Sequence, residues 1–174
     1  MAYLRDCFAS LAMTKNAFLN NVTNSVLMPK NQIQSRKIRA MKCIQTVKKL
    51  FPYARASSLN YSNNWELLVA VMLSARCTDK KVNEITARLF KKYPLFGDYL
   101  RPDKKIFEQD IKASGFYRNK TKNILATASI INEKFNGKIP STMKELLTLP
   151  GVARKTANVV LGQGFNKVEG IAVD

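Results

Sequence analysis

Apolar residues recur every three to four positions along most of this chain, which is the spacing of one face of an α-helix. The spacing predicts a first helix over residues 35–50, whose apolar face holds Ile38, Met41, Ile44, Val47 and Leu50. Pro52 follows, and proline cannot continue a helix. Residues 1–32 are rich in Asn and only weakly periodic, so we expect a poorly ordered or loosely helical extension before a domain over residues 33–174.

A second segment is apolar nearly all round. Residues 65–75 read WELLVAVMLSA, and Asn63 with Glu66 forms a capping pattern before them. We therefore expect a buried central helix. Charged, Gly and Pro residues punctuate further helices over residues 79–92, 103–115, 118–135 and 143–149. Alternating strand patterns never exceed a few residues, so the predicted fold is all-α, a helical bundle or barrel.

Residues 149–155, LPGVARK, join two predicted helices through a Pro-Gly turn. Gly151 can adopt a positive φ without steric cost, and the second helix then begins near Ala153. The amide groups at a helix N-terminus favour a phosphate ligand, and Arg154 adds positive charge there. Helix, tight turn and helix is the layout of a helix-hairpin-helix. An ordinary turn between two helices is the alternative that the Pro-Gly pair leaves open.

The charge of the chain favours the first of these interpretations. Lys and Arg number 29 against 12 Asp and Glu, a formal charge of +17. So basic a chain usually meets a polyanion, because Lys and Arg displace the counterions of phosphates. A general abundance of Lys would give the same charge without a partner. Considered with the hairpin, the charge favours binding to the DNA backbone.

The residue inventory excludes several other chemistries. The chain has no His, so a Ser or Cys nucleophile has no imidazole base, and zinc loses its commonest ligand. Cys7, Cys43 and Cys77 form no CxxC pair, and we expect no metal and no cofactor in this chain. No apolar run approaches the roughly 20 residues of a membrane helix. We also expect no secretory signal, and we expect a cytoplasmic protein without a membrane partner.

Lys155 falls in the first turn of the second hairpin helix. The helix macrodipole disfavours a cation at that end, and Arg154 beside it acts in the same direction. Both effects favour the neutral amine, which is the nucleophilic form. Lys155 is therefore a candidate nucleophile, although most lysines of basic proteins are solvated charges or phosphate contacts.

Three segments, LPGVARKTANVVL…IAVD, ELLVAVMLSARCTDKKVN and SGFYRNKTKNI, resemble the endonuclease III family of DNA glycosylases. The resemblance runs from about Ile38 to Asp174. It implies a monomeric, nucleoid-associated repair enzyme that removes oxidised pyrimidines from duplex DNA and cleaves the strand 3′ to the abasic site. By position, Lys155 matches the family's catalytic lysine, which forms a Schiff base with the sugar, and Asp174 matches its catalytic aspartate.

The same resemblance implies DNA contacts at other positions. Phe116 matches an apolar wedge that enters the base stack. Arg76 stands where many members have a glutamine that fills the space left by the flipped nucleotide. Asp79 would line the damaged-base pocket or cap the helix after it. The hairpin would contact DNA through Leu149, Gly151, Val152, Ala153, Arg154 and Thr156.

Two departures from the family pattern leave alternatives open. Ala153 replaces a second glycine of the hairpin, which requires a negative φ at that residue. The chain stops at Asp174, whereas members continue with a Thr-His pair and, in many, a four-cysteine 4Fe–4S cluster. We therefore expect a domain incomplete at its C-terminus, with any such cluster in the missing part. The alternatives are a catalytically impaired DNA-binding fragment, a monofunctional mismatch or adenine glycosylase, which Lys155 disfavours, and a basic ribosome-associated protein.

Overall fold

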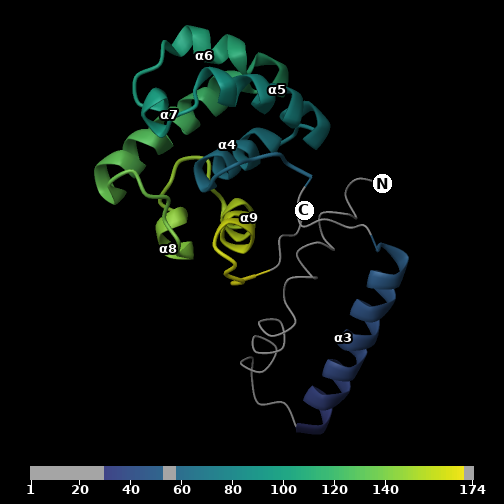
Figure 1. The fold of residues 1–174 in the computed structure, drawn as a ribbon. Coiled ribbons are helices and arrows are strands. Elements are labelled where there is room, and N and C mark those ends of the chain that lie inside the picture. The colour runs from purple at the N-terminus through teal and green to yellow at the C-terminus, as the bar shows by residue number, and fades with distance from the viewer. Residues whose placement is uncertain (1–29, 53–57, 171–174) are drawn as a thin grey trace.

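The computed structural model describes residues 30–52 and 58–170, and every regular element within them is helical. The order is α3 (Lys30–Leu50), α4 (Asn64–Ser74), α5 (Asp79–Lys92), the 3₁₀ helix η1 (Phe96–Tyr99), α6 (Lys104–Asp110), the 3₁₀ helix η2 (Lys112–Ser114), α7 (Tyr117–Phe135), α8 (Met143–Leu146) and α9 (Arg154–Gly164). The prediction of an all-α fold is confirmed (Figure 1). Within the described ranges, none of the helices has the length and apolarity needed to span a bilayer.

The central helix is α4, which packs against α5, α7 and α9 (Figure 1). Eight of its side chains are buried, and Leu67, Leu68 and Leu73 are wholly inaccessible. Its start is fixed by the predicted cap: the Asn63 side chain accepts a hydrogen bond from the Glu66 amide at 2.9 Å. Burial of each large apolar side chain contributes about 1.5–3 kcal/mol, so α4 anchors the rest of the fold.

Two further groups of side chains complete the core. Ile124, Ala128 and Ile131 on α7 are all 0% exposed, as their spacing predicted. An aromatic cluster joins η1 to α4, because the rings of Trp65 and Tyr99 meet edge to face with centroids 5.1 Å apart. Edge-to-face pairs of this kind add about 0.5–1.5 kcal/mol beyond their buried area. The sequence did not indicate η1, although Tyr99 is one of the largest wholly buried residues.

Three predicted helix boundaries and one predicted buried face were wrong. The first helix begins at Lys30 rather than at residue 35, and the helix expected over residues 103–115 divides into α6 and η2. The short helix expected over residues 143–149 ends at Leu146. Ile44 is buried, but Ile38 and Leu50 from the same predicted apolar face are 51% and 67% exposed. Figure 1 shows α3 apart from the other helices, so much of that face meets none of them.

A close approach between α4 and α9 occurs at Gly164. A Cβ atom there would lie 2.8 Å from Asn64 Oδ1 and 3.3 Å from Leu67 Cδ2. We expect the free energy of unfolding of Gly164→Ala to be about 1–2 kcal/mol lower than that of Gly162→Ala, because the side chains of Asn64 and Leu67 must shift to admit the added methyl. Chemical denaturation measures the change. Gly162→Ala on the same helix is the matched control, since no atom lies within 4 Å of its added Cβ. Equal stability of the two variants would contradict this account of the α4–α9 contact.

Candidate DNA-binding and catalytic site

The predicted hairpin is a tight turn between α8 and α9. Gly151 has φ +76°, the left-handed conformation that its sequence context predicted. The Val152 amide donates to the Leu149 carbonyl at 3.1 Å and closes the turn. Ala153 has φ −91° and holds the N-cap position of α9. An alanine therefore fits where the family pattern has its second glycine.

Helix α7 contacts this turn and supports it. The Thr127 hydroxyl, on a wholly buried residue, donates to the Pro150 carbonyl at 3.1 Å. Asn123 packs directly under the turn, because a Cβ atom built on Gly151 would lie 2.7 Å from its Nδ2 atom. The position of the hairpin is therefore set by the core helix and not by the turn alone.

The first turn of α9 presents cations to solvent. Arg154 and Lys155 are its first two residues, and both side chains are exposed. The first turn contains no acidic residue, and the N-cap residue makes no side-chain hydrogen bond. In any α-helix the first N–H groups have no partner within the helix, and their dipoles favour an anion. The start of α9 has the chemistry of a phosphate-binding end with an amine beside it.

The other predicted hairpin residues differ in how far their side chains are exposed to solvent, and therefore in which of their atoms could contact DNA. Leu149 and Val152 are only 3% and 6% exposed, so their side chains belong to the core. The expectation that they contact DNA is therefore limited to their backbone atoms. Thr156 is half-buried on α9, and Ala153 is exposed.

A pair of exposed residues with unusual backbone conformations stands near the hairpin. Arg76 follows α4 with φ +54°, and Phe116 precedes α7 with φ +48°. Residues other than glycine rarely adopt this region, at a cost of about 1–3 kcal/mol each, and such strain gathers at functional sites. The guanidinium carbon of Arg76 lies 5.3 Å from the ring centroid of Phe116, a cation–π contact. Phe116 is 60% exposed, as its loop position predicted.

A shallow hollow brings these two residues and the hairpin together. Its lining consists of Met72, Ala75, Arg76, Phe116, Asn119, Lys120, Asn123 and Gly151. We call it the inter-loop hollow. Three residues that the sequence singled out, Arg76, Phe116 and Gly151, thus share one surface although they lie far apart in the chain.

Sequence reasoning missed Lys120, which lies at this hollow with only 7% of its surface exposed. Its ammonium group donates to the carbonyls of Leu73 at 2.9 Å and Ser114 at 2.8 Å. Burial lowers the pKa of Lys120 below its ordinary value. The burial of Lys120 could have been inferred from the sequence, because Lys120 lies on the same helix face as Ile124 and Ile131.

Of the two carboxylates predicted for the site, Asp79 and Asp174, only Asp79 lies within the described residues. Thr78, not Asp79, is the N-cap of α5, since its side chain accepts from the Lys81 amide at 3.4 Å. The expectation that Asp79 caps this helix is wrong. Asp79 is half-buried in the first turn and accepts a hydrogen bond from the Ser58 hydroxyl, and it does not line the inter-loop hollow. Asp174 lies outside the described residues.

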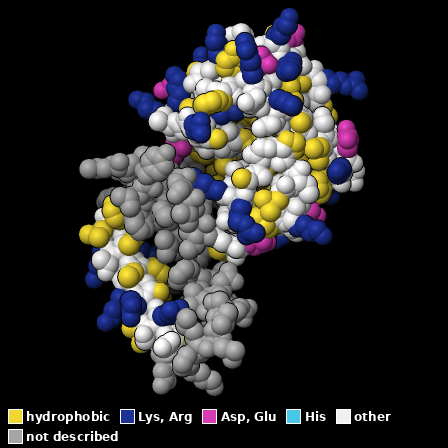
Figure 2. All heavy atoms as spheres, turned by 180° about the vertical axis from the view of Figure 1, so that it is seen from behind, with side chains coloured by type: hydrophobic (Ala, Val, Ile, Leu, Met, Phe, Trp, Pro, Cys, Tyr) yellow, Lys and Arg dark blue, Asp and Glu magenta, His cyan; other side chains and the backbone are white. Residues whose placement is uncertain are grey.

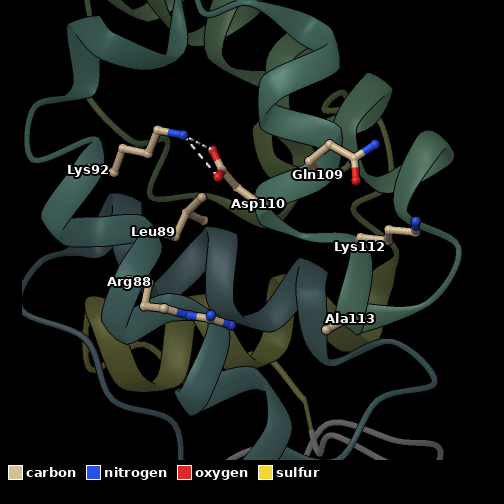
Figure 3. A pocket seen from close by; sticks show the side chains of 7 residues that line it. All are labelled: Arg88, Leu89, Lys92, Gln109, Asp110, Lys112 and Ala113. Atoms are coloured by element: carbon tan, nitrogen blue, oxygen red, sulfur yellow. Dashed lines mark hydrogen bonds and ion pairs between the residues drawn. The ribbon is translucent and has the colours of Figure 1, made fainter.

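A second hollow, shown in Figure 3, lies between α5 and the segment of α6 and η2. Lys92 and Asp110 form an ion pair across it at 2.7 Å, and Asp110 also accepts from the Tyr93 hydroxyl at 2.9 Å. The hydrogen bond to Asp110 raises the pKa of Lys92. None of the residues predicted for function lines this hollow. Its ion pair ties α5 to α6.

The iron–sulfur cluster that many members of the resembled family carry finds no matching ligands in the described part of the chain. Across residues 30–52 and 58–170, no three His, Cys, Asp or Glu side chains gather in a metal-binding group. Cys43 is exposed on α3, and Cys77 is half-buried in the loop after α4. The four thiolates of such a cluster are not supplied here.

Positive charge is spread over the surface. Figure 2 shows Lys and Arg side chains distributed over the helical body and α3, with few Asp and Glu among them. Such a distribution gives a broad attractive field for a polyanion. A field spread in this way does not by itself select one site on the surface.

Comparison with known proteins identifies the family. Residues 69–174 match the model of the HhH-GPD superfamily base excision DNA repair proteins. An endonuclease III from Synechocystis sp. is 47% identical over 143 residues, which cover 82% of this chain and 65% of that protein. Two solved structures, a non-covalent endonuclease III–DNA complex and a trapped endonuclease III–DNA covalent intermediate, each show 44% identity and a TM-score of 0.72 over 85% of this chain and 65% of theirs. The chain thus spans just under two-thirds of the length of these relatives. Because the family model matches residues 69–174, which are more than half of the chain, the chain belongs to the HhH-GPD superfamily of base excision DNA repair proteins.

Proposed function

We propose that this chain carries the chemistry of a DNA glycosylase with abasic-site lyase activity, acting on oxidised pyrimidines in duplex DNA. The observation that supports this most is the exposed Lys155 in the first turn of α9, directly after the Gly151 turn. A phosphate bound at that helix end would hold the sugar near the amine. The relative named endonuclease III and the two solved structures of endonuclease III with DNA support the same proposal.

In the proposed reaction the neutral amine of Lys155 attacks C1′ of the flipped nucleotide. The bond from C1′ to the base breaks, and the base leaves with the bonding electrons and takes up a proton. Opening of the C1′–O4′ bond then gives a protonated Schiff base between C1′ and Nζ. Loss of a C2′ proton and cleavage of the C3′–O3′ bond release the strand on the 3′ side, which carries a 5′-phosphate. Water then hydrolyses the Schiff base, which frees Lys155 and leaves an unsaturated aldehyde at the end of the other strand. We assign to Asp174, on the resemblance, the proton transfer from the Lys155 ammonium and the stabilisation of positive charge on the sugar.

The remaining residues of the site would prepare the DNA. Arg154 and the N-terminal amides of α9 would bind the backbone phosphates, a contact that fixes register without reading sequence. Phe116 and Arg76 would enter the stack and occupy the space left by the flipped nucleotide. The positive surface charge would bring the duplex to this face at a rate that falls with salt.

A strand-cleavage assay tests the proposal. A duplex labelled at the 5′ end and carrying one thymine glycol is incubated with the protein and run on a denaturing gel. We expect a shortened labelled strand that ends in an unsaturated aldehyde, without any alkali treatment. Cleavage that appears only after hot alkali would indicate a monofunctional glycosylase. An intact strand under both conditions, with salt-sensitive DNA binding, would indicate a binding module.

A further inference from the structure

The buried Lys120 links two segments that are distant in the sequence. Leu73 lies in the last turn of α4, three residues before Arg76. Ser114 ends η2, two residues before Phe116. The ammonium group of Lys120 donates to the carbonyl of each at 2.9 and 2.8 Å. One side chain on α7 therefore holds the starting points of both exposed loops.

The carbonyls it binds are those that a helix end leaves without partners. The last C=O groups of a helix lack an intrahelical donor and carry the negative end of its dipole. A charged donor is the strong form of such a contact. Because Lys120 is only 7% exposed, water competes little for these hydrogen bonds. Its buried charge is thus satisfied by helix ends, which explains why a lysine is tolerated on the core face of α7.

The loops are joined a second time at their tips. Arg76 and Phe116 contact each other through the cation–π pair at 5.3 Å, and both have left-handed backbones. Such conformations persist only where the surrounding structure enforces them. The base of each loop is fixed by Lys120, and the tips are fixed by each other. Lys120, Arg76 and Phe116 all line the inter-loop hollow.

From this arrangement we propose that Lys120 is a positioning residue that locks the two loops together and holds Arg76 and Phe116 as one rigid unit. The consequence for repair, which rests on the proposed function, is that the two side chains enter the duplex in a single step. Lys120 itself touches neither DNA nor the reacting sugar in this role. It acts through the backbone of residues 73 and 114.

Hydrogen exchange tests the lock without any activity. In Lys120→Met, which keeps the length of the side chain but removes the donors, we expect the amides of residues 74–77 and 114–117 to exchange about tenfold faster together. Exchange in α5 and α9 should not change. Lys122→Met is the matched control, because Lys122 is exposed on the same helix. Unchanged exchange in either loop, or faster exchange throughout the protein, would overturn the proposal. Should Lys120→Met not fold, Lys120→Gln carries the same comparison, since it removes the charge that strengthens both hydrogen bonds.

A DNA readout separates positioning from general support of the core. A duplex with 2-aminopurine opposite a tetrahydrofuran site brightens when the base is unstacked. We expect Lys120→Met to slow this rise about tenfold, and to have little further effect once Phe116 is replaced by alanine, because coupled residues are not additive. Equal slowing in both backgrounds would show a merely structural role and overturn the proposal. A different outcome would separate the two proposals. If even the unaltered protein gives no rise in 2-aminopurine fluorescence, while Lys120→Met still speeds exchange in both loops, the lock stands and the proposed function fails.

Discussion

Replacement of Lys155 by alanine is expected to abolish covalent trapping of the protein on DNA. With borohydride present, the unaltered protein should form a stable adduct with a duplex that carries an abasic site. The variant lacks the amine of the first turn of α9, so no Schiff base forms to be reduced. We expect strand cleavage to fall by at least about 10³-fold, the scale on which loss of a covalent nucleophile acts. The measurement is the adduct band on a denaturing gel.

Binding must be followed in the same experiment. Lys155→Ala removes one exposed cation from a chain with a formal charge of +17, so its affinity for undamaged duplex should change little. Lys144→Ala is the matched control, because Lys144 is an exposed lysine on the neighbouring α8. It should trap as well as the unaltered protein. Trapping by Lys155→Ala at the normal level would remove Lys155 from the mechanism.

The second large effect is expected at the hairpin. Gly151→Ala places a methyl group on a residue with φ +76° and within 2.7 Å of Asn123 Nδ2. The left-handed backbone and the overpacking each cost about 1–3 kcal/mol, so we expect the free energy of unfolding to fall by about 2 kcal/mol or more. The turn must shift to relieve the contact, and we expect weaker binding to duplex DNA. Chemical denaturation and fluorescence anisotropy measure the two effects.

Two variants separate the causes of this effect. Gly162→Ala adds the same methyl to α9 where no atom lies within 4 Å, and should stabilise the protein by about 0.5–1 kcal/mol. Asn123→Ala combined with Gly151→Ala removes the contact with the Asn123 amide group and leaves the backbone strain and a 3.1 Å contact with the Cβ atom of residue 123. We expect this double variant to recover part of the lost stability. A Gly151→Ala protein as stable as the original would mean that the turn does not require its left-handed conformation.

The parts of the fold that the sequence predicted well share a physical reason. Helix α5 was predicted at its observed bounds, Asp79–Lys92, because its apolar residues repeat at helical spacing and charged residues mark both ends. Helix α4 was predicted within one residue because Asn63 caps it. In contrast, η1 has four residues between two prolines, which is too short for any periodicity to appear.

The candidate site was predictable where a residue type implies its conformation. Gly151 in a Pro-Gly turn implied a positive φ, and Phe116 after Gly115 implied an exposed loop. The left-handed backbones of Arg76 and Phe116 were not predictable, because neither residue type favours that region. Lys120 was missed because a lysine is ordinarily assigned to the surface. Its partners are backbone carbonyls, which leave no mark in the sequence.

The most direct test of the account is to locate the lysine that carries the sugar. The borohydride-reduced adduct on abasic DNA is digested with nuclease and protease, and the modified peptide is read by tandem mass spectrometry. We expect the mass of the reduced sugar on Nζ of Lys155. Modification at Lys120, Lys144 or any other lysine, or the absence of an adduct from a protein that still binds the duplex, would contradict it.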